Sequence, residues 1–275
     1  MTLRTVCLAL LVVSGMGLTE VPLTDAAESP KQLEAACEKG KATACASLGD
    51  LYSFGTGVKQ DDSHAVELYR RACNGGALRG CAALGFTYQN GIGVVRDNQQ
   101  AISLYQKACE GAVFIGCYNL GVMHRDGNDV PSDPVEAVKL FRQACSGGLA
   151  ESCLNLGVMY QKGRGVQPDV VEAIKFYRQA CDRRDMQGCS NLGLMYEEGQ
   201  GVKKDIFQAA AFYKKSCDGG EAGGCYNLGR MYEYGKGVKQ ENADALTYYG
   251  KACDLKDEDG CVAYAQVKTG RRPGR

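Results

Sequence analysis

The chain has 275 residues with 32 basic and 32 acidic side chains, so its formal net charge is zero. Without an overall basic field, neither nucleic acid nor an anionic membrane is an expected partner. Apolar residues make up 45% and charged residues 23%, which is the balance of an ordinary folded globular protein. The 15 cysteines are unusual for such a protein, and their even pairing indicates an oxidising compartment.

The N-terminal segment has the features of an export signal. Arg4 precedes the apolar run VCLALLVV at residues 6–13, which is followed by a polar stretch ending in TDAAES. The run is too short to span a bilayer, so residues 1–27 are predicted to be a cleaved signal peptide. Cys7 lies at the start of the run, whereas a lipoprotein cysteine follows it, so no membrane anchor is expected. The protein is therefore predicted to be secreted or periplasmic.

The other fourteen cysteines form a regular array. The two members of each pair are eight positions apart, and each pair follows the previous one by 36 residues. A fixed period of this length is typical of a solenoid or a similar stack. We expect one repeat domain over residues 28–268, followed by a basic tail at 269–275. The pairs are Cys37 with Cys45, Cys73 with Cys81, Cys109 with Cys117, Cys145 with Cys153, Cys181 with Cys189, Cys217 with Cys225, and Cys253 with Cys261.

The second cysteine of each pair lies in the first turn of a predicted helix, here called helix A. Leucine three, glycine four and tyrosine seven positions later fall within about one third of a helix's circumference, so this stripe is predicted to be buried. Helix A is predicted to end at a glycine, the residue that most readily adopts the left-handed conformation. These glycines are Gly55, Gly91, Gly163, Gly199 and Gly235.

A second helix, helix B, is predicted to complete each repeat and to end at the first cysteine of the next pair. It starts at an aspartate with capping-box spacing to a Gln or Glu, as at Asp97, Asp133, Asp169 and Asp205. Further along, an alanine precedes an aromatic residue by four positions, so both lie on one helix face and are predicted to pack in the core. The aromatic residues are Tyr69, Tyr105, Phe141, Tyr177, Tyr213 and Tyr249.

The cysteine spacing requires a turn. Residues eight apart in one helix would be roughly 12 Å from each other, whereas the Cα atoms of a disulfide lie within about 7 Å. Each pair is therefore predicted to form a disulfide across the turn between helix B and the next helix A, worth roughly 2.6 kcal/mol in the chain-entropy treatment. Zinc binding is the alternative interpretation, but structural zinc sites need four ligands and usually C-x₂₋₄-C spacing. No metal or other cofactor is expected.

The combined pattern resembles a known family. N-L-G-x-M-Y, then G-x-G-V, then A-x-x-x-[YF]-[RK]-x-A-C at a step of 36 residues is similar to the Sel-one-like repeat, a relative of the tetratricopeptide repeat. The cysteine at each end of the turn resembles the secreted cysteine-rich proteins of Helicobacter. This resemblance implies an all-α, right-handed αα-superhelix that acts as an interaction scaffold. It also implies an alternative, because some members are described as penicillin-binding proteins or weak β-lactamases.

Residues for that alternative chemistry are not recognisable in the sequence. A serine β-lactamase needs S-x-x-K together with S-D-N and K-T-G, and no serine here begins S-x-x-K. Ser132 and Asp133 are followed by Pro134 instead of Asn, and Lys268-Thr269-Gly270 lies in a predicted helical region. The two histidines, His64 and His124, cannot form a histidine-rich metal site. No catalytic residue is therefore predicted.

Positions that differ between repeats indicate a binding surface. On helix A, the positions two before and two, five and nine after the second cysteine vary, and they share an arc opposite the buried stripe. This arc is predicted to line a concave groove for a protein or peptide segment, with a β-lactam or peptidoglycan fragment as the alternative ligand. The residues proposed for binding are Asn119, Asn155, Asn191, Asn227, Phe86, Leu194, Arg230 and Tyr234.

The four asparagines recur at one position of the arc. An amide can both donate to and accept from a peptide backbone, so the row could follow an extended chain. The alternative is that each asparagine bonds its own neighbouring helix and has a structural role. Both interpretations remain open at the level of sequence.

Overall fold

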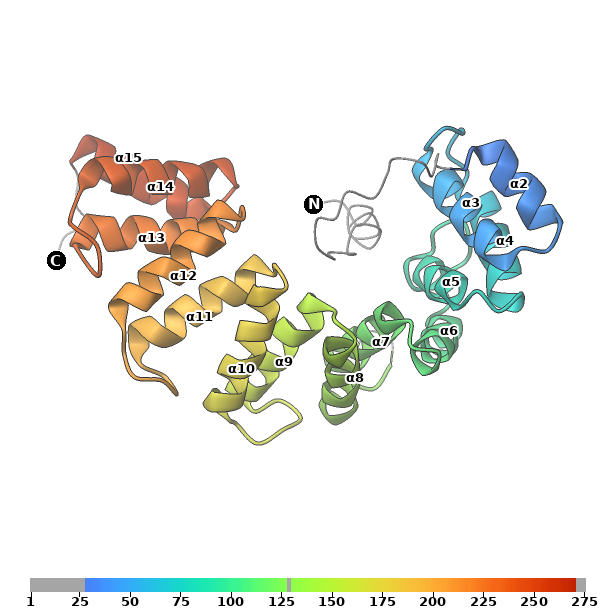
Figure 1. The fold of residues 1–275 in the computed structure, drawn as a ribbon, viewed down its shortest axis with the longest axis horizontal. Coiled ribbons are helices and arrows are strands. Elements are labelled where there is room, and N and C mark those ends of the chain that lie inside the picture. Colours follow the sequence, from blue (N-terminus) through green and yellow to red (C-terminus); the bar gives the residue numbers. More distant parts are fainter. Residues whose placement is uncertain (1–27, 128–129, 271–275) are drawn as a thin grey trace, which may run out of the picture. The chain divides into compact units, whose positions relative to one another are not determined.

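The structure, a computed structural model, describes residues 28–127 and 130–270, and over these ranges it contains helices and no strand (Figure 1). The expected signal segment with Cys7 lies outside the described residues, as does most of the tail. No described helix is both long and apolar enough to cross a membrane. The helices are α2 (Pro30–Glu38), α3 (Ala42–Phe54), α4 (Asp62–Asn74), α5 (Leu78–Asn90), α6 (Asn98–Glu110), α7 (Phe114–Asp126), α8 (Pro134–Ser146), α9 (Ala150–Lys162), α10 (Val170–Asp182), α11 (Met186–Glu198), α12 (Ile206–Asp218), α13 (Ala222–Tyr234), α14 (Asn242–Asp254) and α15 (Glu258–Thr269).

The chain forms two compact units. Unit 1 ends at Gly116 and contains α2 to α6, and unit 2 begins at Cys117 and contains most of α7 and all of α8 to α15. In both units, odd-numbered helices from α3 onward are helices A and even-numbered helices are helices B. This arrangement is the predicted all-α solenoid of 36-residue repeats.

Helix ends follow the predicted signals. The glycines that end α3, α5, α9, α11 and α13 all have positive φ, between 64° and 76°. The carboxylates of Asp97, Asp133, Asp169 and Asp205 each accept a hydrogen bond from the backbone N–H three residues later. The reciprocal bond that completes a capping box is formed at Ser29 and Gln32. Local sequence therefore sets the length of each helix.

The core of each repeat is a glycine of helix A packed against the aromatic ring of helix B. Tyr105, Phe141, Tyr177 and Tyr213 have no exposed surface. A Cβ atom placed on Gly157 would lie 2.4 Å from Tyr177, and one on Gly193 would lie 2.6 Å from Tyr213. Since Cβ atoms do not approach rings so closely, only glycine allows the two helices to reach this separation.

A second aromatic contact joins helix A to helix B, three positions after the glycine. The rings of Tyr160 and Phe176 stack with centroids 5.4 Å apart, and Tyr196 stacks on Phe212 at 5.5 Å. An arginine of the preceding helix B donates a hydrogen bond to the tyrosine hydroxyl, at 2.8 Å between Arg178 and Tyr196. Each tyrosine therefore links its own helix B to that of the preceding repeat.

The predicted disulfides close the turns between helix B and the next helix A. The Cα atoms are 4.4 to 4.8 Å apart in the pairs Cys37 with Cys45, Cys73 with Cys81, Cys145 with Cys153, Cys181 with Cys189, Cys217 with Cys225, and Cys253 with Cys261. Cys109 and Cys117 are disulfide-bonded as well. The second cysteine of a pair, such as Cys45, Cys225 or Cys261, lies in the first turn of its helix A. The turn geometry derived from the spacing is thus confirmed.

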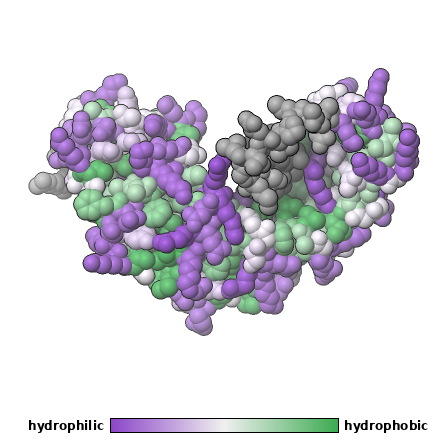
Figure 2. All heavy atoms as spheres, in the orientation of Figure 1, coloured by the Kyte–Doolittle hydropathy of each residue, from purple (hydrophilic) through white to green (hydrophobic). Residues whose placement is uncertain are grey.

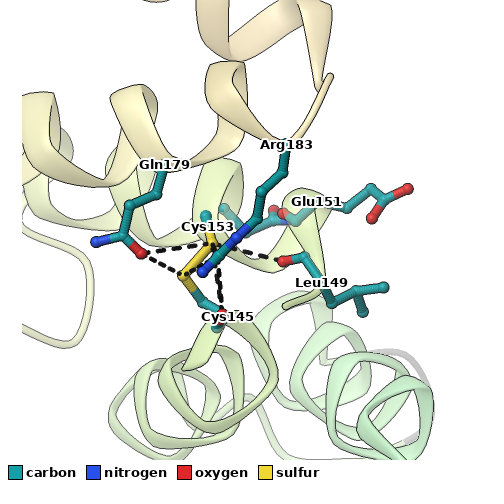
Figure 3. The surroundings of a disulfide bond; sticks show 7 residues. Cys145, Leu149, Glu151, Cys153, Gln179 and Arg183 are labelled. Carbon is teal, nitrogen blue, oxygen red and sulfur yellow. Dashed lines mark hydrogen bonds between the residues drawn. A yellow bond between two sulfur atoms is a disulfide. The ribbon is translucent and has the colours of Figure 1, made fainter. Parts of the chain in front are cut away.

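A side chain from the following repeat covers several of these disulfides. Arg71 donates to the Cys37 carbonyl at 3.0 Å, and Lys107 approaches the Cys73 carbonyl at 3.4 Å. At Cys145 and Cys153 the covering residue is Arg183, which replaces a turn glycine of other repeats (Figure 3). Its Nη1 atom lies 2.9 Å from the Cys145 carbonyl oxygen and 2.8 Å from Cys153 Sγ. This disulfide therefore has a guanidinium directly at one sulfur.

The glycine-to-ring contact predicts opposite effects for two Gly→Ala substitutions. Gly193→Ala should lower the free energy of unfolding by about 1–3 kcal/mol, because the new methyl group overlaps the buried Tyr213 ring. Gly250→Ala should raise it by roughly 0.5–1 kcal/mol, because the helical backbone gains an alanine and its Cβ would sit 3.5 Å from Tyr264 in ordinary contact. Urea denaturation followed by circular dichroism measures both. Equal stability of the two variants would contradict this account of the core.

The guanidinium of Arg183 predicts unequal reduction of the disulfides. A nearby cation stabilises a cysteine thiolate, and a better-stabilised thiolate leaves faster in thiol–disulfide exchange. Cys145–Cys153 should therefore be reduced several-fold faster by dithiothreitol than the equally buried Cys73–Cys81 pair, with Cys153 as the leaving thiolate. Timed alkylation and peptide mass spectrometry measure the two rates. The difference should disappear in Arg183→Gly; if it persists there, the guanidinium is not its cause.

Candidate functional site

In unit 2, the face of helices A opposite the buried stripe holds most of the residues proposed for binding. We call it the outward face. Contacts between successive helices A show that they lie side by side. Gln161 on α9 donates to Met195 on α11 at 3.9 Å, and Arg230 on α13 lies 3.7 Å from Glu197 on α11. Arg125 on α7 donates to the Asn155 side chain on α9. One face therefore runs across α7, α9, α11 and α13.

The four asparagines occupy equivalent positions on this face and are all half-buried. Asn155 accepts from Arg125 and donates to the Glu151 carbonyl at 2.8 Å. Asn227 accepts from Arg230 at 3.2 Å. Asn191 makes no side-chain hydrogen bond to another described residue. The row is thus not uniform, because Asn155 bridges two helices whereas the amide of Asn191 is available.

An apolar row runs parallel to the asparagines, three positions further along each helix. Val122, Val158 and Leu194 are half-buried and pack partly against the core clusters below them. On α13 the row continues with Arg230, and the face ends at Tyr234, whose side chain is 55% exposed. The face therefore presents a line of amides next to a line of apolar side chains, bounded by a cation and an exposed ring.

A third row on this face was not foreseen from the sequence. The buried tyrosine hydroxyls of helix B donate to side chains eight positions after the second cysteine. Tyr177 bonds Gln161 at 2.7 Å, and Tyr213 bonds Glu197 at 2.8 Å. Burial raises the pKa of both phenols, so they remain protonated donors at physiological pH.

The repeat that contains Phe141 shows that the residues of this third row depend on the aromatic ring in the core. Phe141 stands where the neighbouring repeats have tyrosine, so no hydroxyl needs an acceptor. The equivalent position holds Arg125, whose guanidinium lies 5.9 Å from the Phe141 ring centroid in a cation–π contact. Freed from the tyrosine, Arg125 reaches Asn155. The paired replacement is visible in the sequence and was the signal that could have revealed the contact.

Phe86, the remaining proposed binding residue, lies in unit 1 and is described separately. It is half-buried on α5 and lines a small pocket with Phe54, Ala83 and Ile92. Asp50 also lines this pocket and accepts from the Tyr69 hydroxyl at 3.0 Å. Burial raises the pKa of Asp50, and the nearby Arg79 guanidinium opposes this rise. Unit 1 thus has its own apolar recess beside a paired carboxylate.

The residues considered for enzymatic chemistry have structural roles. Ser132 donates to the His124 carbonyl at 3.2 Å, and Asp133 caps α8. Lys268 and Thr269 belong to α15, and Gly270 ends it in the left-handed conformation. Within residues 28–127 and 130–270, no group of three or more His, Cys, Asp or Glu side chains could hold a metal ion.

Comparison with solved structures places this arrangement among known repeat proteins. A protective antigen of uropathogenic Escherichia coli with an SLR fold has 32% sequence identity and a TM-score of 0.80, over 88% of this chain and 52% of the antigen. The chain therefore spans about half the length of that relative. A Sel1 repeat protein of Oxalobacter formigenes has 25% identity and a TM-score of 0.74, over 82% of this chain and 99% of its own.

Helicobacter pylori cysteine rich protein B is also similar, with 32% identity and a TM-score of 0.41 over 48% of this chain and 94% of its own. A search of curated proteins gave no match. The Sel1 repeat pattern itself matches residues 42–76, 78–112, 115–149, 150–185, 187–221 and 222–257, which is most of the chain. The chain belongs to the Sel1 repeat family.

Proposed function

We propose that the protein is a secreted or periplasmic scaffold that binds an extended peptide or protein segment along the outward face of α7, α9, α11 and α13. The Sel1 repeat fold is typical of protein–protein interaction. The observation that carries the proposal is the row of amides beside a row of apolar side chains on adjacent helices. An extended segment presents backbone groups and side chains in the same alternation.

The location outside the cytoplasm is supported by two observations. All fourteen described cysteines are disulfide-bonded, and such bonds persist in oxidising compartments. The E. coli relative is described as a protective antigen. Both agree with the export signal expected at residues 1–27.

The two rows contribute different parts of the binding energy. A neutral hydrogen bond adds about 1 kcal/mol net, whereas micromolar affinity requires roughly 8 kcal/mol. Amides alone therefore cannot hold a segment. The remaining exposed surface of Val158, Leu194 and Tyr234 would supply the apolar anchors, while the asparagines would fix the register of the bound backbone.

Asn191 separates a binding role from a structural role. Asn191→Ala should leave the melting temperature nearly unchanged, because the amide has no described partner and alanine favours helix. It should weaken binding of peptides selected from a display library by about 1–3 kcal/mol, if their backbone groups lose their partner. Isothermal titration calorimetry measures the affinity, and Ala211→Ser on the exposed side of α12 is the control. A stability loss above about 2 kcal/mol with unchanged binding would identify a structural residue.

Asn155→Ala should behave differently from Asn191→Ala. Removing its side chain leaves the half-buried Arg125 guanidinium without an acceptor on α9, so the free energy of unfolding should fall by about 1–3 kcal/mol. Urea denaturation measures this loss. If both variants are equally stable, the bridge between α7 and α9 contributes nothing to the fold.

The alternative function predicts turnover of β-lactams. Because Ser132 and Asp133 have the structural roles described above and Lys268 lies in the helix α15, a chromogenic β-lactam should be hydrolysed no faster than in buffer. Absorbance measurements and intact mass of the incubated protein test this. An acyl adduct on a serine that subsequently hydrolyses would overturn the scaffold proposal in favour of the enzyme.

A further inference from the structure

Exposed apolar side chains of unit 2 are concentrated at one end of its B helices. Among the described residues of unit 2, seven large apolar residues are exposed, and four of them lie at the first or second helical position of α8, α10 and α12. They are Val135 at 54% exposure, Val170 at 36%, Val171 at 51% and Phe207 at 73%. Figure 2 shows that hydrophobic patches bordered by hydrophilic residues occur on the surface of unit 2. Their recurrence at one repeat position is unlike a random scatter of surface residues.

The loops between helices A and B join these residues into a continuous strip. A Cβ atom on Gly165 would lie 2.2 Å from the Pro134 carbonyl oxygen, and one on Gly237 would lie 2.5 Å from that of Ile206. These two loops therefore rest directly on the first turn of the helix B one repeat earlier, an approach that only glycine allows. In the loop between them, the Cβ position of Gly201 lies 3.2 Å from the Val170 Cβ atom. The loops at 163–169, 199–205 and 235–241 thus alternate with the first turns of α8, α10 and α12 (Figure 1). We call this edge the loop strip.

Five exposed cations lie on the loop strip, namely Arg164, Lys203, Lys204, Lys236 and Lys239. None of them forms an ion pair with a described residue. The loops also contain three acidic residues, of which Asp169 and Asp205 are engaged in capping α10 and α12. In the adjoining first turns, Glu136 and Glu172 are paired with Lys139 and Lys175. With five basic and three acidic side chains, the loops themselves carry a small net positive charge.

At the opposite end of the same helices two cations near the end of α12 are paired, whereas the exposed Arg184 and Lys256 form no ion pair with a described residue. Lys214 lies 2.5 Å from Asp218, and Lys215 lies 3.9 Å from Asp182. The zero net charge of the chain, from which no affinity for anionic membranes was expected, therefore conceals an uneven distribution. Unpaired cations are found beside the exposed apolar residues.

We propose that the loop strip of unit 2 docks on an anionic lipid surface, with Phe207, Val171 and Val135 inserted at the headgroup boundary. Interfacial binding combines buried apolar side chains with cations that contact anionic headgroups. A lipid surface accepts a row of protruding side chains without a complementary pocket, whereas a protein partner needs packed complementarity. The strip lies at the helix ends and adjoins the proposed peptide-binding face at Tyr234, the last residue of α13.

Tryptophan fluorescence tests the insertion directly, because the chain contains no tryptophan. Phe207→Trp places one reporter on the loop strip, and Leu255→Trp places one at an exposed site at the other end of the helices. Vesicles of equal parts phosphatidylcholine and phosphatidylglycerol should shift the emission of Phe207→Trp to shorter wavelength and leave Leu255→Trp unchanged. No shift for Phe207→Trp, or equal shifts for both, would overturn the proposal.

A pair of double variants tests the charges with matched chemistry. The first double variant, Lys203→Gln with Lys204→Gln, removes two charges from the loop before α12. The second, Lys214→Gln with Lys215→Gln, removes two charges near the C-terminal end of α12. Each lysine near an anionic surface raises the membrane partition coefficient roughly fivefold. The partition coefficient of the first variant, measured by sedimentation with these vesicles, should therefore be at least tenfold lower than that of the second. Because all variants are prepared with the same N-terminus, any membrane affinity of that segment cancels.

The remaining outcomes also decide the question. Equal loss in the two double variants would mean non-specific attraction, and unchanged sedimentation of Phe207→Ser would mean that no apolar insertion occurs. Either result overturns the proposal. If Phe207→Trp responds to a cell-envelope protein fraction freed of lipid but not to vesicles, the strip is a protein-docking surface instead.

Discussion

The close contact between a glycine of helix A and the aromatic ring of helix B is the constraint on which the rest of the structure depends. At Gly157 and Tyr177 the ring occupies the space that any Cβ atom would fill. This contact sets the separation of the two helices. Once the separation is set, the turn to the next repeat can be short, and a short turn is what brings Cys181 and Cys189 within disulfide distance.

The ring also determines what can stand on the outward face. A buried tyrosine hydroxyl needs an acceptor, and the acceptor must come from the last turns of the preceding helix A, as Gln161 and Glu197 show. When the ring loses its hydroxyl at Phe141, that position is released and Arg125 takes a new partner across the helices. Variation on the face is therefore partly governed by the core beneath it.

This coupling explains which features could be predicted from the sequence. Helix ends, the disulfides and the buried glycine-to-ring stripe depend on residues close in the chain and repeat at every step, so periodicity and turn chemistry were sufficient. The bridge from Arg125 to Asn155 and the contact of Arg183 with Cys153 depend on side-chain reach between residues 30 positions apart. Classifying each repeat position by itself as constant or variable does not predict these contacts. The informative signal is a paired change at two positions of the same repeat or of adjacent repeats.

The contacts between neighbouring repeats also determine which positions tolerate substitution. Each repeat has its own disulfide and its own buried ring, so a substitution affects mainly the adjacent repeats, as expected for a stack held by nearest-neighbour contacts. Asn191 and Lys203 take part in neither the disulfides nor the contacts of the buried rings, since the first lies on the outward face and the second lies in a loop. Such positions can be altered without disturbing the stack. It follows that the amide row and the positive loop strip of unit 2 could be modified separately, because the glycines, rings and disulfides between them already determine the fold.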